Sequence, residues 1–231
     1  MSQSLKTFSQ SLHHRLDHLS YILKVEYVSI FIVWLFTISS LIGIGMGHVE
    51  WFVSKTPLNL LLCFLLILIN VPFDKKFSKG VFLIVFLLGM ILEIVGVWRG
   101  DIFGVYHYGE NLGFKVMGVP LMIGIYWAVL TVVSSQISRL FSSNIFVVAL
   151  TGSALMVGLD FLMEQMAHVF DYWHFTGGIA PFQNYVTWYI AAFFLHLLSF
   201  RFFNKGGGRF SIHLYLNQIV FFLGTYLLIQ L

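Results

Sequence analysis

Long apolar stretches alternate along the chain with short polar segments. A helix needs roughly 20 residues to cross a hydrocarbon core about 30 Å thick, and several of these stretches reach that length. They do not alternate residue by residue, as the strands of a membrane barrel would. The pattern therefore predicts an all-α protein, a polytopic transmembrane helical bundle with about seven spans. The expected spans are 27–46, 57–73, 80–98, 119–137, 144–169, 184–203 and 212–231.

The segment before the first span has a different pattern, in which leucine and phenylalanine recur every three or four residues among basic residues. Such a pattern is typical of an amphipathic helix that lies on a membrane surface. The charged stretch is long and no small-residue cleavage site follows the first span, so a cleavable signal is not expected. We therefore divide the chain into a cytoplasmic surface segment, 1–26, and a single membrane domain, 27–231.

Composition supports the membrane assignment. Apolar residues make up 58% of the chain and charged residues only 10%, whereas soluble domains are about 25% charged. The net charge of +3 arises in the segments between spans, so no nucleic-acid partner is implied. The single cysteine, Cys63, lies in an apolar run and cannot form an internal disulfide.

Lysine and arginine are unequally divided between the two sides of the predicted bundle. Three of them, Lys55, Arg99 and Lys115, fall on one side and the other ten of the 13 on the opposite side. Cytoplasmic loops carry the excess of basic residues. The N-terminus is therefore expected in the cytoplasm and, with seven spans, the C-terminus outside. The ten residues on the cytoplasmic side are Lys6, Arg15, Lys24, Lys75, Lys76, Lys79, Arg139, Arg201, Lys205 and Arg209.

Three acidic residues fall inside predicted spans, where a charge is costly and usually functional. They are Glu93 in the third span and Asp160 and Glu164 in the fifth, and no lysine or arginine lies mid-span to neutralise them. If the fifth helix continues, Asp160, Glu164, His168 and Asp171 share a stripe about 80° wide that climbs toward the outer surface. We predict Glu93, Asp160 and Glu164 to be the catalytic residues.

Polar and aromatic residues gather at the same outer end. One explanation is an aromatic belt at the membrane interface; another is a pocket lined by rings, carboxyls and histidines. Simpler roles are also open, since Arg99 and Asp101 could pair with each other, Asn184 could be an N-cap, and Glu93 could bond between packed helices. The candidate binding residues are Arg99, Asp101, Tyr106, His107, Tyr108, His168, Trp173, Asn184 and Trp188.

Such a pocket suits acid chemistry on an alkene. Two buried carboxyls that lie close together tend to share a proton, which leaves one as a neutral acid near pH 7. A neutral acid can protonate an isolated double bond, and aromatic faces can stabilise the carbocation that results. Water could then add to the cation.

The order and spacing of several short motifs resemble a known family. They are Glu93 with Gly96, then Gly104, Tyr106 and Tyr108, Gly118 to Pro120, Asp160 to Glu164 with Ala167, Trp173, Ala180 to Tyr185, and Trp188. Over roughly residues 80 to 190 the chain resembles the membrane carotenoid-biosynthesis proteins typified by the carotenoid 1',2'-hydratases. The resemblance implies addition of water to the terminal isoprenoid double bond of an acyclic or monocyclic carotenoid, without a redox cofactor.

The resemblance also implies the surroundings of the protein. The expected location is the cytoplasmic membrane of a prokaryote, and the expected partners are a polyene substrate from the bilayer, membrane lipids and other carotenoid-pathway enzymes.

Two alternatives remain open from the residues. The first is a zinc-dependent intramembrane hydrolase, with Asp160, Glu164, His107, His168 and His174 as possible ligands. The second is a membrane protein that binds a polyene or a quinone without catalysis.

Overall fold

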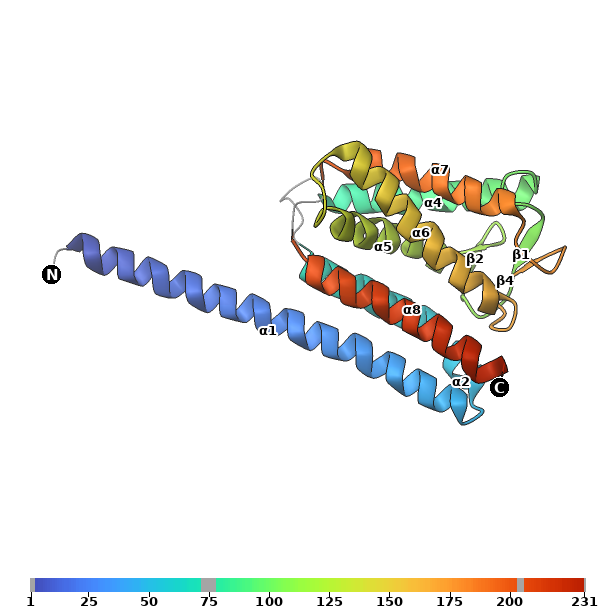
Figure 1. Ribbon diagram of the computed structural model, residues 1–231, viewed down its shortest axis with the longest axis horizontal. Helices are drawn as coiled ribbons and strands as arrows, with labels where there is room; N and C mark the ends of the chain where they lie inside the picture. Colours follow the sequence, from blue (N-terminus) through green and yellow to red (C-terminus); the bar gives the residue numbers. More distant parts are fainter. Residues whose placement is uncertain (1–2, 72–77, 203–205, 231) are drawn as a thin grey trace.

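The computed structural model describes residues 3–71, 78–202 and 206–230, and side chains within 23–71, 80–202 and 206–229. Within this part of the chain, seven long helices run alternately up and down a bundle (Figure 1). Each occupies one of the apolar stretches, which confirms the predicted helical bundle. The helices are α1 (Gln3–Gly45), α3 (Thr56–Asn70), α4 (Ser78–Arg99), α5 (Leu121–Ser138), α6 (Ile145–Ala167), α7 (Phe182–Ser199) and α8 (Gly208–Gln230).

Six segments of the described chain are long and apolar enough to cross a membrane, so the protein is an integral membrane protein. They are Leu23–Gly45, Val49–Asn70, Gly80–Arg99, Leu121–Ser138, Ile145–Ala167 and Gly208–Ile229. The seventh predicted span corresponds to α7, which is not among them. Gln183, Asn184 and His196 lower the hydropathy of α7 below that of the six segments. Even so, α7 packs along α6 within the bundle.

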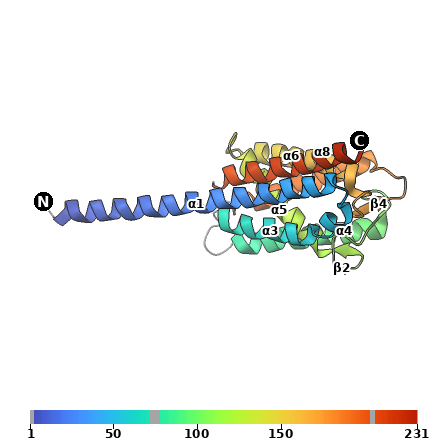
Figure 2. The same ribbon diagram turned by 90° about the horizontal axis from the view of Figure 1, so that it is seen from below.

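Helix α1 is continuous across the predicted boundary at residue 26. Its N-terminal half extends well beyond the other helices in both views (Figures 1 and 2). Residues 1–2 and the side chains up to residue 22 lie outside the described part, so the amphipathic surface of this segment stays a prediction.

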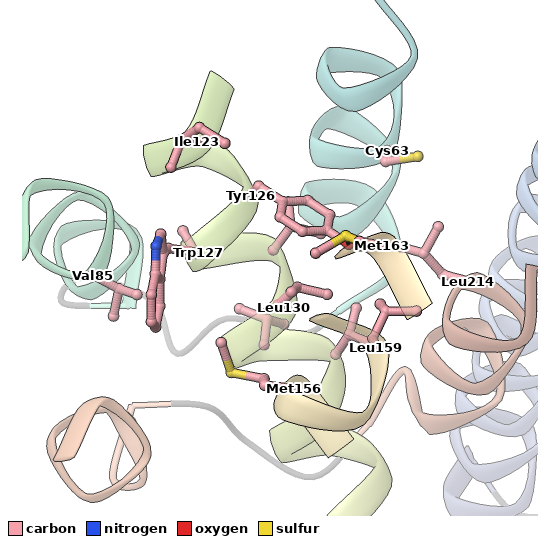
Figure 3. Close-up of a cluster of buried hydrophobic side chains, with 14 of the residues drawn as sticks. Cys63, Val85, Ile123, Tyr126, Trp127, Leu130, Met156, Leu159, Met163 and Leu214 are labelled. Carbon is pink, nitrogen blue, oxygen red and sulfur yellow. Dashed lines mark hydrogen bonds between the residues drawn. The ribbon is translucent and has the colours of Figure 1, made fainter. Parts of the chain in front are cut away.

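Helix α5 lies at the centre of the bundle. Every residue from Tyr126 to Ser138 is buried, as expected for a helix that packs against neighbours on all sides. Figure 3 shows that Tyr126 points toward Met163 of α6, whereas its neighbour Trp127 points the other way, toward α4. The close approach of α4 requires Gly89, because a Cβ there would lie 2.7 Å from the Cβ of Trp127.

One end of the bundle carries the short elements. These are α2 (Val49–Val53), β1 (Tyr106–Tyr108), β2 (Lys115–Val116), β3 (Val119–Pro120) and β4 (Trp173–Phe175). Strand β1 pairs antiparallel with β4, and β2 with β3. The sequence pattern placed Val119 and Pro120 at the start of the span 119–137 and left the other short segments between spans, so the two ladders are new information from the structure. We call this end the ladder end.

The described basic residues separate between the two ends of the bundle as the sequence predicts. Arg209 lies 3.9 Å from Glu26, and the guanidinium of Arg139 lies over the ring of Phe200, both at the end opposite the ladders. The side chains of Lys6, Arg15, Lys75, Lys76, Lys79 and Lys205 lie outside the described part. Which end faces the cytoplasm stays a prediction.

Candidate functional site

The three predicted catalytic carboxyls converge on one buried cavity near the ladder end. Glu93 comes from α4, and Asp160 and Glu164 come from successive turns of α6. The cavity has a volume of about 20 Å³, and about 10–15 Å³ is enough to hold one water molecule. We call it the acid cavity. Its lining residues are Glu93, Tyr106, Tyr108, Ile123, Tyr126, Asp160, Met163, Glu164, Trp173, Phe175, Asn184 and Trp188.

Glu93 accepts three hydrogen bonds. The hydroxyls of Tyr106 and Tyr108 donate to Oε2 at 2.5 and 2.8 Å, and Nε1 of Trp127 donates to Oε1 at 2.9 Å. Burial raises the pKa of both tyrosines, and the neighbouring Glu93 carboxylate raises it further. Both phenols therefore stay protonated and serve as donors. Three donors directed at one carboxyl match its ionised, acceptor-only form.

The two tyrosines reach Glu93 because they occupy alternate positions of β1. Side chains of a strand point to opposite faces in turn, and the outer two residues of β1 are buried while His107 between them is exposed. Pairing of Tyr106 with Phe175 and of Tyr108 with Trp173 holds this orientation. The ladder is thus the element that supplies two of the three donors to Glu93.

Asp160 and Glu164 are bridged by one amide. Nδ2 of Asn184 lies 3.2 Å from Oδ2 of Asp160 and 3.4 Å from Oε1 of Glu164. Glu164 also accepts a hydrogen bond from Nε1 of Trp173 at 3.0 Å. Asn184 is on a different helix from these two acids. It lies in the first turn of α7, which packs against α6.

Asp160 is the least satisfied of the three acids. It is 1% exposed, and its Oδ1 atom has no hydrogen-bond partner among the described residues. An ionised carboxylate in this position would lack most of the donors that its charge requires. The geometry therefore favours a neutral carboxylic acid at Asp160 beside an ionised Glu93.

Aromatic rings enclose the carboxyls. Trp188 stacks on Trp127 with ring centroids 4.0 Å apart and planes 17° apart. Trp127, together with Tyr126, was absent from the sequence-based candidates because both lie in an apolar span. A signal was present, however, since a tryptophan buried inside a span needs an acceptor for its indole N–H, and Glu93 supplies it.

Five of the predicted binding residues line the acid cavity, namely Tyr106, Tyr108, Trp173, Asn184 and Trp188. The other four do not line it. Arg99 and Asp101 pair with each other at 2.7 Å with more than half of each side chain exposed. The hydrogen bond from Arg99 lowers the pKa of Asp101.

The two histidines among these four residues also face away from the cavity. His107 stacks on His174 on the outer face of the ladder, with ring centroids 5.2 Å apart. His168 is the exposed C-cap of α6. His107 faces outward because side chains alternate between the two faces of β1. His168 is exposed because α6 ends just before it.

The predicted polar stripe on the fifth span stops at Glu164, because α6 ends at Ala167. Asp171 has a left-handed backbone, with φ of 52°, and turns away from the helix axis. It accepts hydrogen bonds from the backbone N–H of Glu110 and from Nε2 of His174, both at 2.8 Å. These two bonds lower the pKa of Asp171.

The ligands required by the zinc alternative are not brought together. His107 and His174 lie on the outer face of the β1–β4 ladder and His168 lies at the exposed end of α6, whereas Glu164 faces the acid cavity. Among the described residues, no three His, Cys, Asp or Glu side chains are arranged to hold a metal ion.

A sequence model of the family described as "Carotenoid biosynthesis protein" matches residues 56–231. The match covers most of the chain and all the residues of the acid cavity, so the chain belongs to this family. Searches of curated proteins and of solved structures found no match.

Proposed function

We propose that this member of the carotenoid biosynthesis protein family is a hydratase. Its substrate would be an acyclic or monocyclic carotenoid, and its product the tertiary alcohol formed by adding water to the terminal isoprenoid double bond. The observation that carries the proposal is the unequal hydrogen bonding of three carboxyls around a cavity with room for one water molecule. This arrangement supplies an acid, a fixed negative charge and a site for water.

In the proposed reaction Asp160 is the general acid. Its proton goes to the less substituted carbon of the double bond, whose π electrons form the new C–H bond. The other carbon becomes a tertiary cation. Positioned general acids typically contribute 10²–10⁴-fold to a rate.

The cation would be stabilised by its surroundings. The ionised Glu93 places a negative charge on one side of the cavity, held by three donors that need no rearrangement. The faces of Trp188 and Tyr106 add the attraction of aromatic rings for a cation. Water then attacks the cation through oxygen, and its extra proton returns to Asp160, directly or through Glu164. The net change is alkene plus water to alcohol, with the acid regenerated.

The decisive experiment is to supply the protein with an acyclic carotenoid in water enriched in oxygen-18. The purified protein in detergent, or a host that makes acyclic carotenoids, can be used. We expect a product heavier by one water molecule, with the label in its hydroxyl group. The matched control is Asp160→Asn, which keeps the side-chain shape and should give no labelled product.

Other outcomes would point elsewhere. A product with two fewer hydrogens would indicate a desaturase. An unchanged polyene that remains bound to the protein would favour the binding role, and an unchanged polyene with no binding would refute the proposal.

A further inference from the structure

A second cavity of about 680 Å³ lies between α1, α3, α5 and α8. Cavities of this size hold small organic ligands. We call it the groove. Its deep wall consists of buried side chains, including Cys63, Ile123 and Phe222. Most of its surface is apolar, and two of its polar side chains, Thr37 and Asn217, bond to each other at 2.9 Å.

The groove opens on the outer surface of the bundle between α1 and α3. The lining residues on these helices and on α2 include large apolar side chains that are exposed, namely Phe36, Trp51 and Leu58. In a membrane-spanning bundle, exposed apolar side chains at this depth face lipid. A ligand would therefore reach the groove sideways from the bilayer.

One layer of side chains separates the groove from the acid cavity. Ile123, Tyr126, Met163 and Trp173 line both. The hydroxyl of Tyr126 donates to Oε1 of Gln218 at 2.6 Å and lies 2.9 Å from Sδ of Met163. Figure 3 shows the ring of Tyr126 directed at Met163 between α5 and α6. Movement of this ring or of the flexible Met163 side chain would join the two spaces.

The groove is short compared with the membrane. Along α3 and its N-cap residue, the lining runs from Lys55 to Cys63, which is about 12 Å at 1.5 Å per residue. The hydrocarbon core is about 30 Å thick. A long linear chain would therefore place only one end in the groove and leave the rest in the lipid.

We infer that the groove binds one end of a linear polyisoprenoid and delivers its terminal double bond past Tyr126 and Met163 to the acid cavity. This inference rests on the proposed function for its reaction, and it adds the place and the direction of substrate binding. The far end of the substrate stays outside the protein, so the protein recognises an end group rather than a whole carotenoid.

Two substitutions on α3 form a matched pair for the test. Leu62 lines the groove, whereas Leu65 is 47% exposed on the same helix and does not line it. Leu62→Trp places a large ring inside the groove, and Leu65→Trp adds the same ring to the lipid-facing surface. Both variants and the wild type are purified in detergent, and bound acyclic carotenoid is measured by its visible absorption. We expect Leu62→Trp to bind at least tenfold more weakly and Leu65→Trp to bind like the wild type.

Turnover separates this inference from the proposed function. A short alkene that carries one terminal isoprenoid unit is small enough to pass the added ring, so Leu62→Trp should still hydrate it while losing activity on the long polyene. If Leu62→Trp hydrates the long polyene as fast as Leu65→Trp does, the groove is refuted and the hydratase stands. If the wild type hydrates neither substrate but only Leu62→Trp loses polyene binding, the hydratase is refuted and the groove stands.

A measurement on the unaltered protein covers the case in which Leu62→Trp does not fold. Cys63 is the only cysteine of the chain and lines the groove. Bound polyene should slow the reaction of Cys63 with a small, membrane-permeable thiol reagent at least severalfold, whereas added phospholipid should not. Equal labelling rates with and without saturating polyene, or equal protection by phospholipid, would overturn the inference.

Discussion

Replacing each cavity acid by its amide should separate the roles of Asp160 and Glu93 through stability as well as activity. Asp160→Asn changes an acid that accepts a single 3.2 Å bond from Asn184 and leaves one oxygen without a partner. An asparagine oxygen can accept the same bond, so the free energy of unfolding should change by no more than about 1 kcal/mol. Loss of the proton donor should slow hydration about 10²–10⁴-fold.

Glu93→Gln should behave differently, because three donors converge on its carboxyl. A glutamine has one acceptor oxygen, so at least one buried donor among Tyr106, Tyr108 and Trp127 loses its acceptor. An unsatisfied buried group costs about 1–3 kcal/mol, and each remaining bond loses its charge assistance, worth about 1 kcal/mol. Glu93→Gln should therefore destabilise the protein by about 2–5 kcal/mol.

The assay compares denaturant-induced unfolding of the purified variants in detergent, with turnover measured per folded molecule. Glu110→Gln is the control, since the side chain of Glu110 is 85% exposed and pairs with Lys115 in a surface ion pair; it should change stability by less than about 1 kcal/mol. If Asp160→Asn is destabilised as much as Glu93→Gln, or keeps wild-type turnover, the division into a neutral acid and an ionised partner is refuted.

Four further predictions follow from the same geometry. Chelator treatment should leave hydration by the purified protein unchanged, because proton transfer from a carboxylic acid needs no metal; activity that is lost and then restored by zinc would support the hydrolase alternative. Trp188→Leu should slow turnover about thirtyfold, since a desolvated cation–π contact is worth about 2 kcal/mol, while Trp98→Leu, at a residue 85% exposed, should leave turnover unchanged. Hydrogen bonds lower the pKa of Asp171, so its contribution to stability is present at neutral pH and is lost below about pH 4; unfolding measured against pH should show a smaller acid loss for Asp171→Asn. A carotenoid whose far end is cyclised should be hydrated at its free end as fast as the acyclic one, and product analysis that shows a strong far-end dependence would contradict one-ended binding.

The helices could be predicted from the sequence because membrane spans depend on a local property, the apolar length of a segment. Glu93, Asp160 and Glu164 stood out for the same reason, since a carboxyl inside an apolar span is costly wherever the helix packs. A helix at α7 was also predicted, although its polar residues keep it out of the set of segments apolar enough to cross a membrane. These polar residues include Asn184, which bridges two of the acids.

The ladders could not be predicted in the same way. Strands of two or three residues are stabilised by pairing between segments far apart in the chain, such as Tyr106 with Phe175, and local propensity carries little information about such pairing. Without the ladder, His107 could not be distinguished from Tyr106 and Tyr108 as a cavity residue. Because side chains alternate between the two faces of β1, His107 points away from the acid cavity while Tyr106 and Tyr108 point into it.

The hydrogen bonds of Glu93 also bear on which group captures the proposed cation. A tertiary cation reacts with the nearest nucleophile, and a carboxylate oxygen in the cavity competes with water. Both Glu93 oxygens already accept hydrogen bonds from buried donors, which reduces their availability to form a covalent bond with carbon. The acid cavity has room for about one water molecule before Tyr126 or Met163 moves to admit the double bond from the groove. The donors from β1 and α5 would therefore keep Glu93 as a fixed charge that stabilises the cation, and leave water as the group that adds to it.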